Sequence, residues 1–249
     1  MKVRRSNGIF FVTLLVALTS LQTVTSFAFV SPLPRVALYT SDSAGVPLIY
    51  ATLLEKGYDV TMINAECVTD GSIFGYDVVI FGGGFTHIGD WLASETYRQN
   101  LEAYIAQGGK YIGICGGGFL GIWIVDGFTL SQALQYLINY EYLLLYDKLD
   151  TKGKWLVRWI WGNSFDERGY HYITWAGGTE YSCLLDNGFT VEAKYVFDKP
   201  WLPYWGKPAI VSGTLGDGEL VLFGPHPEYA CPYPDGPDNM HLILTAVEL

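Results

Sequence analysis

The sequence contains little charge, and little of that charge is positive. Only 16% of its 249 residues are charged, and 15 Lys and Arg stand against 25 Asp and Glu, which gives a net charge of -10. So few basic residues provide no positive surface for a phosphate backbone or an anionic membrane, and we therefore expect no nucleic-acid partner. The shortage of charge, together with 50% hydrophobic residues, also excludes intrinsic disorder.

The sequence also lacks an apolar run of the roughly 20 residues that a membrane-spanning helix needs. Its nearest approach, residues 9–18, follows basic residues and precedes small or polar ones through Ser26, which is the layout of a secretory signal. We predict that residues 1–30 are a signal peptide. An uncleaved N-terminal anchor is the alternative, because residues 27–30 extend the apolar stretch. Both place the body outside the cytoplasm, secreted or anchored to the outer face of the membrane through this segment only.

Internal repeats and low-complexity tracts are absent, so residues 35–249 are predicted to form a single domain. The first half alternates short apolar runs with helical patterns, which predicts strands and crossover helices of a parallel sheet. The expected strands are 36–39, 58–63, 77–81 and 110–114, and the expected helices are 46–56 and 91–107. The predicted fold class is therefore α/β.

The second half has few helical patterns before a last helix at about 238–248. Its strand-like runs are 140–149, 154–161, 170–175, 190–197, 209–212 and 219–223, separated by Gly, Asp and Pro turns. The half is also rich in Trp. These aromatic side chains suit the half-buried surface of a strand-rich core, and a stacking surface for sugars is the alternative.

A cysteine stands where the buried strand 110–114 meets the following helix. The segment Gly113-Ile-Cys-Gly-Gly117 has the form Gly-x-Cys-x-Gly, which is typical of a nucleophile elbow. Glycines two residues before and two after Cys115 allow the neighbouring elements to approach closely. The thiol would stand at a helix N-terminus, where the free amides favour a thiolate and the Gly116 amide can bind an oxyanion.

A second segment supplies a base and a carboxylate. His226 follows the strand-like run 219–223, and Glu228 follows two residues later. Because Pro225 and Pro227 favour an extended chain, we expect the side chains of His226 and Glu228 to share one side and to hydrogen bond. With Cys115, these residues provide a nucleophile, a base and a group that orients the base.

A glycine loop, Phe81-Gly-Gly-Gly-Phe85, ends the third predicted strand, at the sheet edge where α/β proteins bind ligands. Gly83 or Gly84 could provide the second oxyanion donor. His87 follows the loop and could lie near the site, whereas His171 and His241 are interpreted as structural.

Other interpretations of the elbow remain open. Cys115 could be a small buried hydrophobic residue. The segment from Gly116 to Gly121 also fits Gly-x-Gly-x-x-Gly with Glu141 twenty residues later, a dinucleotide pattern. Against it, this run follows what reads as the fourth strand, and an exported protein is a poor host for NAD. We therefore predict no cofactor.

The cysteines and histidines show no metal-site spacing, so we predict no metal. If Cys115 stays reduced, three cysteines remain and at most one internal disulfide can form. Cys183 with Cys231 is the pair that we expect.

Together these motifs resemble the class I glutamine amidotransferase-like superfamily, and more closely the biotin-protein ligase N-terminal domain family. The resemblance covers residues 36–125 and 206–230. It is carried by Val36–Tyr39, Gly57–Val60, Tyr76–Gly84, Gly108–Gly118 and Leu222–Glu228. It implies a flavodoxin-like three-layer sandwich with a mostly parallel central sheet, and a Cys-His-Glu triad at Cys115, His226 and Glu228. The sequence contains no ligase catalytic domain.

Two positions depart from the superfamily pattern. Phe119 stands where glutaminase domains usually carry Gln, and Gly82 replaces the usual Pro of the third-strand loop. The hypothesis is therefore an exported thiol hydrolase of a small-molecule or peptide amide or γ-glutamyl-like bond, and not a standard glutaminase. The alternatives are a ligand-binding module without turnover and a thiol sensor built on the same elbow.

Overall fold

The computed structural model describes residues 33–43, 45–127, 154–159, 170–175, 177–196, 204–229 and 239–249. They belong to one compact unit, Leu33–Leu249. The predicted signal segment 1–30 and the predicted strand 140–149 lie outside the described residues, as do Glu141 and Cys231. No helix in the described ranges is both long enough and apolar enough to cross a membrane.

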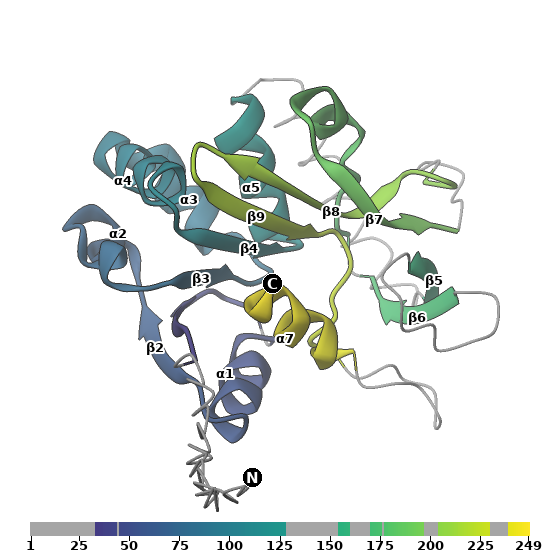
Figure 1. Ribbon diagram of the computed structural model, residues 1–249, viewed down its shortest axis with the longest axis horizontal. Coiled ribbons are helices and arrows are strands. Elements are labelled where there is room, and N and C mark those ends of the chain that lie inside the picture. The colour runs from purple at the N-terminus through teal and green to yellow at the C-terminus, as the bar shows by residue number, and fades with distance from the viewer. Residues whose placement is uncertain are drawn as a thin grey trace, which may run out of the picture. The chain divides into compact units, whose positions relative to one another are not determined.

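The described residues form a nine-stranded sheet with the order β2-β1-β3-β4-β9-β8-β7-β5-β6 (Figure 1). The first five in this order pair in parallel; they are β2 (Asp59–Ile63), β1 (Arg35–Tyr39), β3 (Val78–Phe81), β4 (Lys110–Ile114) and β9 (Gly218–Phe223). The others pair antiparallel; they are β8 (Pro208–Leu215), β7 (Thr190–Tyr195), β5 (Lys154–Trp159) and β6 (Tyr170–Thr174). The predicted parallel sheet with a strand-rich second half is confirmed.

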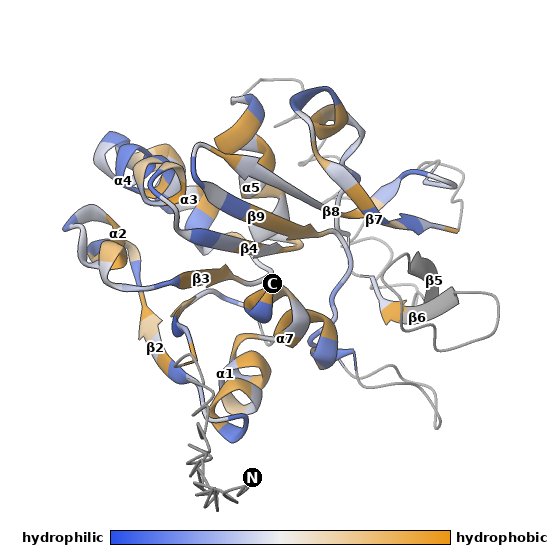
Figure 2. Cartoon of the chain, viewed as in Figure 1, coloured by the Kyte–Doolittle hydropathy of each residue, from blue (hydrophilic) through white to orange (hydrophobic). Residues whose placement is uncertain are grey.

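Helices cover both faces of the parallel strands, which explains why those strands read as continuous apolar runs. Alternate residues of each strand enter two separate cores: Leu38 and Ile112 pack with one set of helices, and Tyr39 and Tyr111 pack with the other. The first set is α1 (Gly45–Glu55) and α7 (Met240–Glu248), and the second includes α4 (Glu95–Ala106) and α5 (Gly116–Asp126). Figure 2 shows the hydrophobic colour along β3 and on α5. The flavodoxin-like three-layer arrangement is confirmed.

Some predicted elements differ from those observed. The predicted helix 91–107 is two helices, α3 (Thr86–Ala93) and α4, which meet at Ser94. Ser94 is extended (φ -134°, ψ 118°), and its side chain accepts a hydrogen bond from the Tyr97 amide at 3.2 Å. A serine that caps a new helix in this way ends the previous one. Three short elements were not predicted: α2 (Ala65–Thr69), η1 (Ser72–Gly75) and η2 (Ser182–Asn187).

Candidate active site

Cys115 occupies a sharp turn between β4 and α5. Its backbone has φ 52° and ψ -106°, and it is the one non-glycine residue with positive φ in the described ranges. Its amide donates to the Phe223 carbonyl at 2.7 Å, and its carbonyl accepts from the Phe119 amide at 2.9 Å. Hydrogen bonds to β9 and α5 therefore hold a strained conformation, as a nucleophile elbow requires.

The glycines around Cys115 are required by close packing. A Cβ at Gly113 would lie 2.5 Å from the Gly117 carbonyl oxygen. A Cβ at Gly117 would collide with the carbonyl oxygen of Phe81, and one at Gly116 with that of Gly84. These neighbours are backbone atoms and cannot rotate away, so larger residues do not fit.

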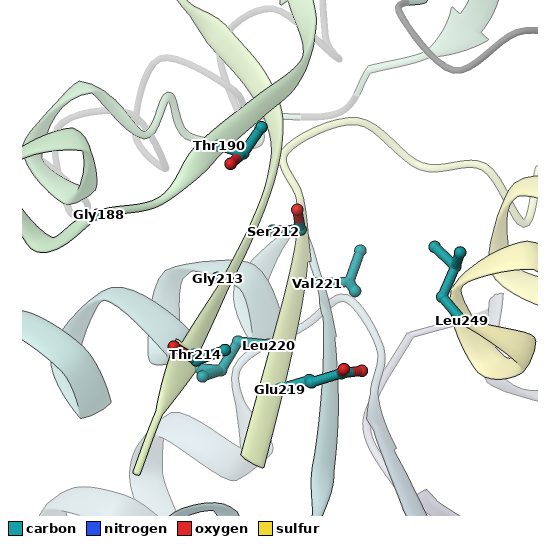
Figure 3. A pocket seen from close by; sticks show the side chains of 9 residues that line it. All are labelled: Gly188, Thr190, Ser212, Gly213, Thr214, Glu219, Leu220, Val221 and Leu249. Atoms are coloured by element: carbon teal, nitrogen blue, oxygen red, sulfur yellow. The ribbon is translucent and has the colours of Figure 1, made fainter. Parts of the chain in front are cut away.

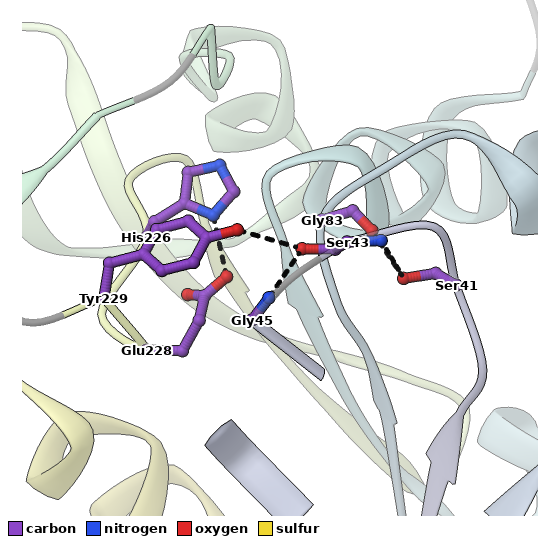
Figure 4. A network of polar contacts seen from close by, with 7 residues as sticks. All are labelled: Ser41, Ser43, Gly45, Gly83, His226, Glu228 and Tyr229. Atoms are coloured by element: carbon purple, nitrogen blue, oxygen red, sulfur yellow. Dashed lines mark hydrogen bonds and ion pairs between the residues drawn. The ribbon is translucent and has the colours of Figure 1, made fainter. Parts of the chain in front are cut away.

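His226 and Glu228 form a buried pair at the end of β9 (Figure 4). Nδ1 of His226 lies 2.7 Å from Oε1 of Glu228, and the two residues are only 4% and 3% exposed. The His226 amide donates to the Thr174 carbonyl at 2.7 Å, which ties the segment to β6. The predicted bond between the two side chains is present, but the chain is not extended: residues 227 and 228 form a turn, closed by the Tyr229 amide and the His226 carbonyl at 3.5 Å.

The imidazole of His226 also hydrogen bonds with the Cys115 side chain. Burial lowers the pKa of His226, but the charges of Cys115 and Glu228 and the hydrogen bonds with both outweigh it, so this pKa lies well above its ordinary value. The structure thus brings Cys115, His226 and Glu228 together. The imidazole can carry a proton between the sulfur and a bound group while Glu228 holds its other nitrogen.

The glycine loop lies beside this histidine. A Cβ at Gly83 would stand 2.7 Å from Cε1 of His226, so the loop backbone abuts the ring. The amides of Gly83, Gly84 and Gly116 donate no hydrogen bond within the described residues. The Gly84 carbonyl oxygen packs against the backbone of Gly116, so the glycine loop lies next to the elbow that carries Cys115.

The loop after β1 fixes the glycine loop, a contribution that the sequence did not predict. The Ser41 hydroxyl donates to the Gly83 carbonyl at 2.8 Å. Oδ1 of Asp42 accepts from the Phe85 amide at 2.9 Å and from the Thr86 hydroxyl at 3.0 Å. A Ser-Asp-Ser run that begins two residues after the end of a buried strand was the available signal, since this sheet edge carries the ligand sites of α/β proteins.

Gly45 and Tyr229 were also not predicted. A Cβ at Gly45 would lie 2.5 Å from Oε1 of Glu228, so this glycine makes room for the carboxylate. Tyr229 stacks on the imidazole of His226, with ring centroids 5.0 Å apart. Gly45 is far from Glu228 in the chain, and the stacking of Tyr229 on His226 depends on the turn between them. A single sequence therefore gives little sign of either contact.

His87 lies behind the elbow. It is fully buried, and Nε2 would be 3.3 Å from a Cβ at Gly116. Burial lowers the pKa of His87 to about 4, so the ring is neutral at physiological pH. The ring packs edge-on against Tyr39 and Phe81. His87 is thus near the site, as the sequence suggested, without contacting His226 or Glu228 in any described interaction.

The glycines of the dinucleotide pattern are covered. A Cβ at Gly118 would collide with the Tyr181 hydroxyl, and one at Gly121 would lie 2.5 Å from a Leu222 methyl. Gly118 and Gly121 therefore serve the packing of α5, whereas Gly116, the first glycine of the pattern, lies at the elbow. Within the described residues, no group of three or more His, Cys, Asp or Glu could hold a metal ion. Cys183 is a free thiol, and Cys231, its expected partner, lies outside the described residues.

A hollow of about 460 Å³ lies elsewhere, over β8 and β9 (Figure 3). Ser212, Thr214, Glu219 and Leu249 contribute to its wall. Glu219 pairs with Lys110 at the amino ends of β9 and β4, whereas Cys115 follows the carboxyl end of β4. The hollow is therefore separate from the Cys115 site.

Comparisons with known proteins agree with the fold. Residues 49–143 match the model of the CobB/CobQ-like glutamine amidotransferase domain. A search of curated proteins finds no significant match. A solved structure named as a GMP synthase component from Thermoplasma acidophilum has a TM-score of 0.53 at 13% identity over 87% of this chain and 93% of its own. A cytoplasmic protein from Salmonella typhimurium aligns with a TM-score of 0.49 at 13% identity over 86% and 98%. The chain has a class I glutamine amidotransferase-like fold.

Proposed function

We propose that this chain is an exported thiol hydrolase that cleaves an amide or γ-glutamyl-like bond of a small molecule or peptide. The observation that carries the proposal is the buried His226–Glu228 pair, joined at 2.7 Å, beside a cysteine in a strained elbow. Burial of polar groups is costly even when they are paired, and a strained nucleophile next to a buried base is the arrangement of covalent catalysis.

The proposed reaction has two halves. The Cys115 sulfur, paired as a thiolate with the His226 imidazolium, attacks the carbonyl carbon and forms a tetrahedral adduct. The Gly116 amide, with that of Gly83 or Gly84, holds the oxyanion. His226 then gives its proton to the leaving nitrogen, the C–N bond breaks, and a thioester remains on Cys115. Next, His226 takes a proton from water, whose oxygen attacks the thioester. The C–S bond then breaks, the acid leaves, and the thiolate of Cys115 and the imidazolium of His226 are restored. Glu228 orients the imidazole throughout.

The residue at position 119 supports the proposal that the substrate is not bound in the way that a standard glutaminase binds glutamine. It stands where those domains usually carry Gln, it is only 4% exposed, and its ring packs edge-on against Trp123 at 5.2 Å. A buried phenyl ring offers no hydrogen bond to a substrate amide. Export through residues 1–30 would further separate the protein from cytosolic acceptors of ammonia. The closer likeness to the biotin-protein ligase N-terminal domain family is part of the same proposal.

The test is to trap the acyl-enzyme. Wild-type protein and the variants Cys115→Ala and Cys183→Ala would be incubated with a panel of peptide amides and γ-glutamyl compounds and quenched in acid. The mass of each intact protein would then be measured by mass spectrometry. We expect a mass increase on wild type and on Cys183→Ala, together with the hydrolysed acid in solution, and neither with Cys115→Ala. Equal hydrolysis by Cys115→Ala would refute the proposal, and binding without any adduct or product would identify a ligand-binding module instead.

A further inference from the structure

Tyr229 packs face to face on the imidazole of His226. Their ring centroids are 5.0 Å apart and the rings are inclined by 28° (Figure 4). The turn from His226 to Tyr229, with Pro227 at its second position, brings the two rings to the same side of the chain. Proline favours that position of a β-turn, so the local sequence prepares the stack.

The hydroxyl end of the tyrosine is anchored to a distant loop. The Tyr229 Oη lies 3.3 Å from the Ser43 Oγ, which also accepts a hydrogen bond from the Gly45 amide at 3.2 Å. Ser43 belongs to the loop after β1, whose neighbouring residue Ser41 holds Gly83. The same loop therefore fixes both the backbone that abuts the imidazole and the ring that stacks on it.

We propose that Tyr229 is a positioning residue for the base: its ring, anchored through Ser43, holds the His226 imidazole in the orientation that Glu228 and Cys115 both require. This inference rests on the proposed function of the same site. An imidazole can rotate about two side-chain bonds, and a hydrogen bond at Nδ1 alone leaves freedom for the opposite nitrogen. The ring of Tyr229, stacked on the face of the imidazole, removes that freedom. The electron-rich face of a tyrosine also favours a positively charged partner.

The experiment measures how fast iodoacetamide alkylates Cys115 at pH 6 and at pH 9, by peptide mass spectrometry under reducing conditions. The charged groups that face His226 among the described residues are Cys115 and Glu228. If the imidazole of His226 is correctly placed beside Cys115, the sulfur stays reactive at pH 6. At pH 9 a thiol ionises without a neighbouring base. The ratio of the two rates therefore reports the position of the base, provided that each variant is folded at both pH values.

We expect Tyr229→Leu to lower the pH 6 rate about tenfold and to leave the pH 9 rate within about twofold, since loss of a desolvated cation–π contact is of this size. Tyr229→Phe keeps the ring and should lose less. Tyr76→Leu is the matched control, because Tyr76 is also half-buried but precedes the amino end of β3. If Tyr229→Leu keeps the wild-type ratio of the alkylation rates at pH 6 and pH 9, Tyr229 does not position His226.

Two further results separate the possible failures. If His226→Ala also keeps the wild-type ratio, the base itself is not engaged and the proposed function fails with the inference. If His226→Ala loses the pH 6 reactivity and Tyr229→Leu does not, only the role of Tyr229 fails. Should Tyr229→Leu not fold, proton NMR of histidine-labelled wild type decides: an upfield ring-current shift of the His226 Cε1 proton is expected, and an unshifted signal overturns the inference.

Discussion

Gly83 lies directly against the imidazole of His226, because a Cβ on its backbone would stand 2.7 Å from Cε1 of the ring. A real side chain almost never approaches an atom so closely, so either the loop or the ring would have to move. The lack of a side chain at Gly83 therefore sets where the imidazole of His226 can stand.

Gly83→Ala should displace His226 and slow the alkylation of Cys115 at pH 6 by about tenfold, which is the effect of one lost contact of about 1.4 kcal/mol. Gly89→Ala is the matched control, since a Cβ at Gly89 meets nothing within 4 Å and Ala favours the α3 helix. Equal rates in the two variants would show that the loop does not position the ring.

Gly45→Ala should disturb Glu228, because the new Cβ would lie 2.5 Å from its Oε1. Overpacking a close contact of this kind costs about 1–3 kcal/mol, measured as the free energy of unfolding in urea. Gly75→Ala, where a Cβ meets nothing within 4 Å, should change that free energy much less. A stable Gly45→Ala variant with unchanged thiol reactivity would contradict the assigned geometry.

Glu228→Gln should lower the pKa of His226, because it removes one of the charges that raise it. The folded pKa of His226 lies above its unfolded value, so its contribution to stability is complete below about pH 6.5 and is lost as the pH rises through the folded pKa. NMR titration of the imidazole measures the change. A titration midpoint that Glu228→Gln leaves unmoved would show that the carboxylate does not act on the ring.

Asp42→Ala should destabilise the protein by about 1–2 kcal/mol, because the carboxylate caps the start of α3 through the Phe85 amide and Thr86. Burial tends to raise the pKa of Asp42, but these hydrogen bonds outweigh it and hold the pKa below its ordinary value. The stabilisation is therefore present above about pH 4 and is lost as the pH falls through the lowered pKa. Urea unfolding at pH 7 and pH 3 checks this, with the exposed Asp59→Ala as the control: the two variants should differ at pH 7 and converge at pH 3. An equal difference at both pH values would contradict the capping role.

The sequence predicted the parts of the site that are local in the chain. Gly113, Cys115 and Gly117 lie within five residues, and His226 and Glu228 within three, so their spacing carries the geometry. The parallel strands were recognisable because burial on both faces makes them apolar throughout. Ser41, Asp42 and Tyr229 act on residues far away in the chain or through ring packing, and one sequence records neither.

The differences have equally specific causes. Pro225 and Pro227 favour an extended chain, but Pro227 also fits the second position of a β-turn. The observed turn is closed by the hydrogen bond from the Tyr229 amide to the His226 carbonyl. The predicted helix 91–107 is broken at Ser94 because its hydroxyl caps the second helix. The amphipathic pattern continues through this residue, so the pattern alone did not reveal the break.

The central claim is that His226 activates the Cys115 thiol, and the most direct measurement compares thiols within one protein. Cys67 and Cys183 are free, and burial and the nearby Glu180 raise the pKa of Cys183 to about 11. At pH 6, iodoacetamide should label Cys115 at least about tenfold faster than either reference cysteine, and His226→Ala should abolish that advantage. Labelling of Cys115 that is no faster than that of Cys67, or that is unchanged in His226→Ala, would contradict the account.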